Sequence, residues 1–132
     1  QRLDIAIDAV GGPTLGADPM TCTFVLQARR RGIHIPGFFV RKESKGHGTM
    51  SWIEGVKSVG SGSKVLVLED VITTGASSIR SINHLRDAGF QVMGLVCLVD
   101  RMEGGREAIE AVNVPVTSVY RKVDFPGMSD QA

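Results

Sequence analysis

One apolar run constrains the fold of this chain more than any other feature. Residues 64–68 (KVLVL) are apolar almost throughout, and two acidic residues and a Thr- and Gly-containing segment follow them. A continuous apolar run of this length is typical of a strand that is buried on both faces. Such strands occur in parallel sheets whose two faces are covered by helices, so the run predicts a central strand of that kind.

Similar apolar runs alternate with helix-like patterns along the whole chain. Strands are predicted at Leu3–Val10, Gly37–Val40, Lys64–Leu68, Gln91–Val99 and Val114–Tyr120. Helices are predicted at Asp18–Arg31, Ala76–Ala88 and Arg106–Ala111. Regular strand–helix alternation favours an α/β fold, a parallel sheet flanked by helices.

Glycine and proline set the expected boundaries of the first elements. The first strand is expected to end at Gly11-Gly12-Pro13. Asp18 is a suitable N-cap for the first helix, because Pro19 would then occupy the favoured first helical position. Gly32 is expected to end that helix, with three arginines in its last turn, where positive charge suits the helix dipole.

Length and composition exclude several classes of protein. The 132 residues are enough for one domain, and 42% hydrophobic residues can build one core. A net charge of +1 and 5% aromatic residues argue against a general nucleic-acid binder. No apolar stretch approaches the roughly 20 residues that span a bilayer, and no secretion signal opens the chain, so a cytoplasmic protein without a membrane partner is expected.

The cysteines and histidines show no metal-ligand spacing. Cys22 and Cys97 lie in apolar segments without a CxxC pattern, so both are predicted to be reduced thiols in the core. His34 and His84 are predicted to be structural. We therefore expect no metal site built from the protein alone.

The segment from Lys42 to Ser63 fits none of the regular patterns. It contains five glycines, several cations and only scattered apolar residues. Structureless stretches of this length are usually lids or linkers, so the chain is interpreted as one domain, residues 1–132, with a mobile loop around residues 42–62. A partly helical turn is expected around Trp52–Val56.

Residues 69–77 (EDVITTGAS) carry the most specific chemistry. They join the end of a buried strand to the start of a helix, the place where open α/β sheets bind ligands. Thr73, Thr74, Gly75 and Ser77 offer hydroxyls and N–H groups suited to a phosphate monoester. Glu69 and Asp70 can accept hydrogen bonds from sugar hydroxyls near a bound Mg²⁺. An acidic strand end before a Thr-rich helix start is the alternative interpretation.

Two further segments have a composition suited to catalysis. Residues 41–48 (RKESKGHG) place cations and an imidazole on a loop hinged by glycines, which could close over a departing anion. A solvated basic loop is the alternative. Residues 100–104 (DRMEG) follow another apolar strand and carry the planar guanidinium of Arg101, for which a surface ion pair is the alternative interpretation.

Together these segments resemble the type I phosphoribosyltransferase family, and its orotate phosphoribosyltransferases in particular. Residues 69–77 are similar to the family's phosphoribosyl-pyrophosphate (PRPP) signature, residues 41–48 to its mobile catalytic loop, and residues 100–104 to its D-R-x-E-G stretch. The resemblance implies a Rossmann-like core. It also implies a Mg²⁺-dependent glycosyltransferase (pentosyltransferase) that joins PRPP to orotate, giving orotidine 5′-monophosphate and pyrophosphate in pyrimidine biosynthesis.

The resemblance also assigns roles to individual residues. In PRPP binding, Glu69 and Asp70 would hold the ribose and Thr73 to Ser77 the 5-phosphate, and the cations of the loop would serve the pyrophosphate. The full set implied for PRPP is Arg41, Lys42, Lys45, His47, Glu69, Asp70, Val71, Ile72, Thr73, Thr74, Gly75, Ala76 and Ser77. Thr73 and Arg101 would contact orotate, and the catalytic residues would be Lys45, His47 and Asp70.

The remaining expectations concern the pyrophosphate loop, the metal and the partners. Thr14 to Ala17 match the family's pyrophosphate loop in part. Mg²⁺ would bind mainly through PRPP, and a homodimer would share the mobile loop between subunits. A family-type N-terminal section, a hood over the base, is absent from the chain as given. The alternatives are a phosphoribosyltransferase for another base and a non-catalytic module that senses PRPP or a nucleotide.

Overall fold

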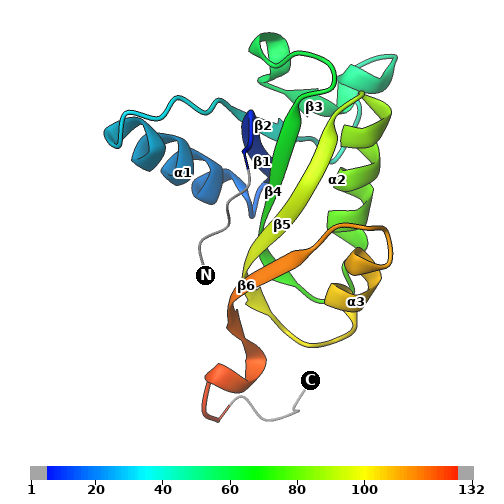
Figure 1. Cartoon of the computed structure of the whole chain (residues 1–132). Helices are drawn as coiled ribbons and strands as arrows, with labels where there is room; N and C mark the ends of the chain where they lie inside the picture. Colours follow the sequence, from blue (N-terminus) through cyan, green and yellow to red (C-terminus); the bar gives the residue numbers. More distant parts are fainter. Residues whose placement is uncertain (1–5, 128–132) are drawn as a thin grey trace.

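A six-stranded sheet forms the centre of the molecule. The computed structural model describes residues 6–127, and its strands are β1 (Ala9–Pro13), β2 (Gly37–Val40), β3 (Ile53–Glu54), β4 (Lys64–Ile72), β5 (Gln91–Asp100) and β6 (Val116–Arg121). Their order across the sheet is β3-β2-β1-β4-β5-β6 (Figure 1). All neighbours pair in parallel except β3, which is antiparallel to β2. The predicted α/β class and parallel sheet are confirmed.

Helices cover both faces of this sheet. Successive residues of β4 pack into two different clusters. Leu66 and Leu68 contribute to a cluster with Phe24 of α1 (Asp18–Arg30), whereas Val65 and Val67 join the larger cluster with Ile82. Because side chains alternate between the faces of a strand, α1 lies on one face of the sheet. The opposite face carries α2 (Ala76–Asp87) and α3 (Gly105–Glu110).

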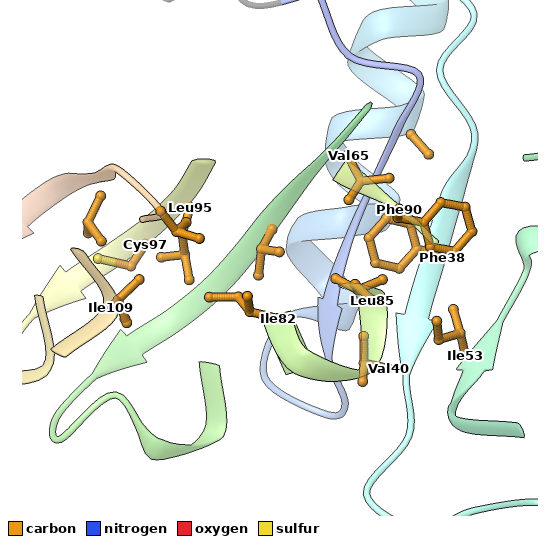
Figure 2. Packing of buried hydrophobic residues seen from close by; sticks show 14 of the residues in the cluster. Phe38, Val40, Ile53, Val65, Ile82, Leu85, Phe90, Leu95, Cys97 and Ile109 are labelled. Atoms are coloured by element: carbon orange, nitrogen blue, oxygen red, sulfur yellow. The ribbon is translucent and has the colours of Figure 1, made fainter. Parts of the chain in front are cut away.

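The main core lies between the sheet and α2. Phe38, Ile82, Leu85 and Leu95 are at most 1% exposed there (Figure 2). Burying a side chain of this size contributes about 1.5–3 kcal/mol, so this core fixes how α2 is seated on the sheet. The start of α2 is thereby fixed against the end of β4.

The first strand runs through the glycines that were predicted to end it. β1 begins at Ala9 and includes Gly11 and Gly12, so the predicted limits Leu3–Val10 were wrong, and residues 3–5 lie outside the described part. A Cβ at Gly11 would collide with the carbonyl oxygen of Phe38, and one at Gly12 with that of Leu68. The glycines therefore allow β1 to fit closely between its neighbours.

The N-cap of the first helix lies one residue earlier than predicted. Ala17 is the N-cap and Asp18 is already helical, without a side-chain cap, so the predicted N-cap role of Asp18 was wrong. Burial raises the pKa of Asp18 above its usual value. The helix ends at Arg30, and Gly32 follows with a positive φ of 76°, as expected for a residue that terminates a helix.

The segment between β2 and β4 is more ordered than its composition indicated. It contains the 3-10 helices η1 (Thr49–Trp52) and η2 (Val56–Ser58) on either side of β3. Of the partly helical turn expected at Trp52–Val56, Trp52 ends η1 and Val56 begins η2, whereas Ile53–Glu54 between them form β3. Ile53 and Val56 are buried in the main core, which ties this segment to the sheet.

Two other expectations concern the surface. Cys97 is buried as predicted, but Cys22 is exposed, so its assignment to the core was wrong; both thiols are free. Within residues 6–127 no helix has the length and apolar character needed to cross a membrane.

Candidate active site

Four loops with polar and charged residues meet at one edge of the sheet. Because β1, β2, β4 and β5 are parallel, the loops that leave their carboxyl ends all lie at the same edge. These loops are residues 14–17, 41–48, 73–75 and 101–104. The structure thus brings together all four segments in which the sequence predicted site residues.

The acidic pair at the end of β4 is divided between the two faces of the strand. The Glu69 side chain is 5% exposed, and one of its carboxylate oxygens accepts a hydrogen bond from the Ser78 hydroxyl on α2 at 2.9 Å. Burial raises the pKa of Glu69 to about 7. Asp70 is half-buried and accepts a hydrogen bond from the Val71 N–H at 2.7 Å. Its carboxylate lies where a Cβ of Gly16 would be, beside the loop after β1.

The loop after β4 presents backbone groups at the start of α2. Gly75 is the N-cap, with a φ of 83°, and a Cβ there would press on the backbone of Gly105. The Thr74 hydroxyl accepts a weak hydrogen bond from the Ala76 N–H at 3.5 Å. N–H groups at the first turn of a 12-residue helix, together with the exposed Ser77, can hold a phosphate.

The other predicted residues of this loop differ in what they can offer a ligand. Thr73 is half-buried, and Thr74 and Ala76 are exposed. Val71 is 41% exposed, whereas the Ile72 side chain is 1% exposed and packs in the main core. Ile72 can therefore contact a ligand only through its backbone.

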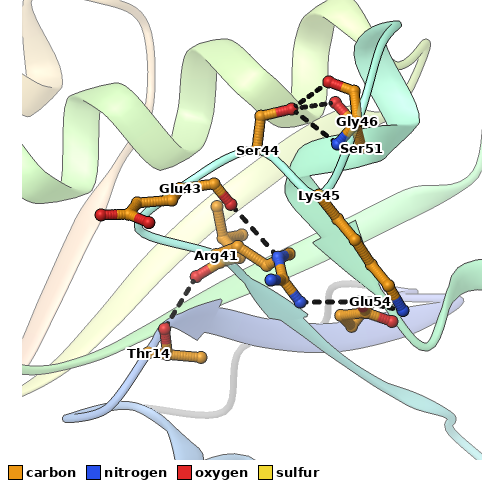
Figure 3. A network of polar contacts seen from close by, with 9 residues as sticks. Thr14, Arg41, Glu43, Ser44, Lys45, Gly46, Ser51 and Glu54 are labelled. Carbon is orange, nitrogen blue, oxygen red and sulfur yellow. Dashed lines mark hydrogen bonds and ion pairs between the residues drawn. The ribbon is translucent and has the colours of Figure 1, made fainter.

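Two cations of the loop after β2 contact the same carboxylate, that of Glu54, which sequence reasoning missed. Arg41 Nη1 lies 2.9 Å from Glu54 Oε1, and Lys45 Nζ lies 3.7 Å from the same oxygen (Figure 3). Arg41 Nε also donates to the Glu43 carbonyl at 3.1 Å. Glu54 lies on β3, and the Phe39–Glu54 register of β2 and β3 places it beside the loop. Lys42 and His47 are exposed.

A pocket of about 180 Å³ opens between this loop and α2. Its walls are Pro13, Thr14, Val40, Arg41, Lys42, Ser77, Arg80, Ser81 and His84. None of these described lining residues is acidic, so the pocket suits an anion. Sequence reasoning missed Arg80 and treated His84 only as structural. His84 stacks on Trp52 with ring centroids 4.1 Å apart, which joins η1 to α2.

The last loop carries Arg101, whose side chain is partly free. Arg101 Nη2 pairs with Glu103 at 3.2 Å on the surface, but its buried Nε has no hydrogen-bond partner within residues 6–127. Buried donors normally find a partner, so the unpaired Nε–H marks Arg101 as a candidate ligand-binding side chain. The Arg101 backbone N–H donates to the Ile72 carbonyl at 3.0 Å, which fixes the loop to the end of β4.

The arrangement can also be tested for a bound cation. No group of three or more His, Cys, Asp or Glu side chains in the described part could hold a metal ion. Asp70 offers hard carboxylate oxygens at the end of β4, just before the phosphate loop. Mg²⁺ usually binds through one or two carboxylates and the phosphates of its substrate, so the residues fit a cation that arrives with a polyphosphate.

Comparison with known proteins identifies the family. The profile of the phosphoribosyl transferase domain matches residues 20–126, most of the chain. The chain belongs to this phosphoribosyltransferase family. Its orotate-type relatives include the orotate phosphoribosyltransferases of Leptospira biflexa, 44% identical over 94% of this chain, and of Sorangium cellulosum, 43% identical over 89%.

A solved structure agrees with this assignment. The orotate phosphoribosyltransferase of Mycobacterium tuberculosis in complex with PRPP has a TM-score of 0.78 and 37% identity, and the match covers 92% of this phosphoribosyltransferase chain and 66% of that chain. The alignments with the Leptospira and Sorangium proteins cover 66% and 62% of those proteins. The chain thus spans about two thirds or less of the length of these relatives.

Proposed function

We propose that this chain is the core of an orotate phosphoribosyltransferase, which transfers the phosphoribosyl group of PRPP to orotate. One observation carries the proposal: the four loops at the carboxyl edge of the sheet hold a helix start suited to a phosphate, the half-buried carboxylate of Asp70, a group of cations and a partly unpaired arginine. These are the groups that PRPP and a carboxylated base require. The names of the relatives support the choice of orotate.

The reaction requires positioning and charge stabilisation rather than a covalent nucleophile. The start of α2 would hold the 5-phosphate, and Asp70 would accept hydrogen bonds from the ribose hydroxyls. Arg41, Lys42, Lys45 and His47 would stabilise the departing pyrophosphate, and Arg101 and Thr73 would orient the base. Mg²⁺, when bound with PRPP, would neutralise part of the charge of the leaving group.

The structure modifies the proposed role of Glu69. Its carboxylate bonds to Ser78 and is almost fully buried, so its first role here is to seat α2 against β4. We propose that Asp70 is the principal ribose contact. Lys45, His47 and Asp70 remain the proposed catalytic residues, and Glu69 contributes by fixing the adjacent phosphate loop.

The proposal extends to partners and location. A homodimer in which the loop after β2 completes the partner's site is proposed, as is a cytoplasmic location. A phosphoribosyltransferase for another base shares the same fold and the same phosphate groups, so Arg101 is the feature that separates the two possibilities. A module that binds PRPP without turnover can be distinguished from an enzyme only by measuring turnover.

Binding and turnover are therefore measured separately. PRPP and orotate are titrated into the chain with and without Mg²⁺ by calorimetry, and orotate consumption is then followed with uracil, adenine and hypoxanthine as competitors. The proposal expects Mg²⁺-dependent PRPP binding and competition by none of the other bases. PRPP binding with turnover of another base would contradict the choice of orotate, and PRPP binding without any turnover would favour the sensing module.

A further inference from the structure

One carboxylate organises the loop that carries Arg101. Asp100 is the last residue of β5, and it is only 2% exposed. Its Oδ1 accepts the Met102 N–H at 2.8 Å, and its Oδ2 accepts Arg106 Nε at 3.0 Å. The two oxygens therefore hold the residue after Arg101 and the first turn of α3 at the same time.

Arg106 completes this contact with the rest of its guanidinium. Nη1 donates to the Val116 carbonyl at 2.7 Å, and Nη2 donates to the Ser118 hydroxyl at 2.7 Å. All three guanidinium nitrogens of Arg106 thus bind the end of β5 or the first half of β6. A lysine could pair with Asp100 but could not make this planar fork of three hydrogen bonds.

The conformation held by these contacts is an unusual one. Met102 has a φ of 60°, in the left-handed region that a residue with a side chain rarely adopts. The Asp100–Met102 hydrogen bond stabilises it. On the other side, Gly105 packs so closely that a Cβ would collide with Ile72 and press on the backbone at Thr73 and Gly75. The backbone that carries Arg101 is therefore held at Met102 and at Gly105.

We propose that Asp100 and Arg106 are positioning residues that hold Arg101 in the orientation needed to contact the base. This inference rests on the proposed function, in which Arg101 binds orotate. Both Asp100 oxygens and all three Arg106 nitrogens are engaged within the protein, so neither side chain is proposed to contact the ligand itself. Their effect on base recognition passes through Arg101, whose buried Nε is unpaired.

The test isolates the contribution of the base to binding. The dissociation constants of orotidine 5′-monophosphate and of ribose 5-phosphate are measured for each protein, and their ratio is the base preference. Arg101→Ala should reduce this preference by about 10–100-fold, since it removes a charged hydrogen-bond partner. Arg106→Gln should reduce it by at least about threefold while ribose 5-phosphate binding per folded molecule stays unchanged.

A matched control and a double variant separate positioning from general damage. Arg86 also donates to a carbonyl oxygen, that of Val112 at 2.7 Å, but it lies on α2 far along the helix from the loop. Arg86→Gln should leave the base preference unchanged. If Arg106 acts through Arg101, the double variant Arg101→Ala/Arg106→Gln should lose no more preference than Arg101→Ala alone. Arg106→Lys should retain more of the base preference than Arg106→Gln does.

The outcomes distinguish failure of this inference from failure of the proposed function. A wild-type chain that binds both ligands equally would contradict the base role of Arg101 and, with it, the inference. A wild-type chain with a clear preference that Arg106→Gln retains would overturn the inference alone. Losses that add in the double variant would likewise overturn it, because they would show an effect independent of Arg101.

Discussion

Asp70 and Glu69 are adjacent in the chain but occupy different environments. Asp70 lies beside the loop after β1, and its backbone is part of a strand that the core already holds. Asp70→Asn should therefore weaken PRPP binding by about tenfold or more while changing the free energy of unfolding little. Calorimetric titration and urea denaturation measure the two effects. Unchanged PRPP affinity in a destabilised protein would make Asp70 structural.

Glu69 should instead affect how the free energy of unfolding depends on pH. Its pKa is about 7 in the folded protein and near 4.5 when unfolded. Between these values the folded protein binds more protons, so the free energy of unfolding should fall as pH rises from 4.5 through 7, by at most about 3 kcal/mol. Glu69→Gln should flatten this slope in urea denaturation at pH 5, 6, 7 and 8. The exposed Glu107→Gln should keep the wild-type slope; equal slopes in all three proteins would contradict the assignment.

Glu54 holds two cations that the proposed reaction needs for pyrophosphate. Glu54→Gln should free Arg41 and Lys45, and pyrophosphate should then bind about two- to fivefold tighter, as is typical for losing a competing exposed ion pair. Glu43→Gln is the control, because it removes one negative charge from the loop after β2 without breaking either pair. Equal gains in both variants would mean that only net charge matters. The effect should diminish at high salt.

At the scale of elements, β1 depends on its glycines. The Gly12 Cα faces the backbone carbonyl of Leu68 on β4, which cannot rotate away as a side chain would. Gly12→Ala should lower the free energy of unfolding by about 3 kcal/mol or more. Gly46→Ala, in the loop after β2 where an added Cβ would meet no atom within 4 Å, should change it by less than about 0.5 kcal/mol. Similar values for both in urea denaturation would show that β1 can move.

Local patterns predicted most elements but not their contacts. The apolar run at residues 64–68 identified β4, and Gly32 and Gly89 marked the ends of α1 and α2. β1 was misplaced because glycine pairs usually mark turns, and only the distance to Phe38 and Leu68 shows why they lie in a strand. β3 was missed because two residues are too few to show the alternation of apolar and polar side chains that marks a strand. Their pairing with β2 makes them a strand.

At the scale of the whole molecule, the proposed dimer makes a specific prediction. If the loop after β2 completes the partner's site, a Lys45→Ala/His47→Ala chain and an Asp70→Asn chain should each be inactive, yet their mixture should recover up to about a quarter of the activity. One hybrid site then has all its groups intact. Orotate consumption by the mixture measures the recovery. Mixed dimers that recover nothing would show that the loop acts within its own chain.

The sequence by itself determined the class of the fold and the content of the four loops. Continuous apolar runs, helix-terminating glycines and the order of polar residues are local properties, so residues 41–48, 69–77 and 100–104 could be recognised without coordinates. Their meeting at one edge follows from the parallel pairing of the strands that precede them.

Only the tertiary structure decided how those residues face one another. β1 lies beside β4, which brings Gly16 to Asp70, and β3 pairs with β2, which brings Glu54 to Arg41. The same packing buries Glu69 against Ser78 and joins Asp100 to Arg106. Each of these contacts depends on how closely two backbones approach across the sheet or against a helix, and no local pattern in the chain encodes that distance.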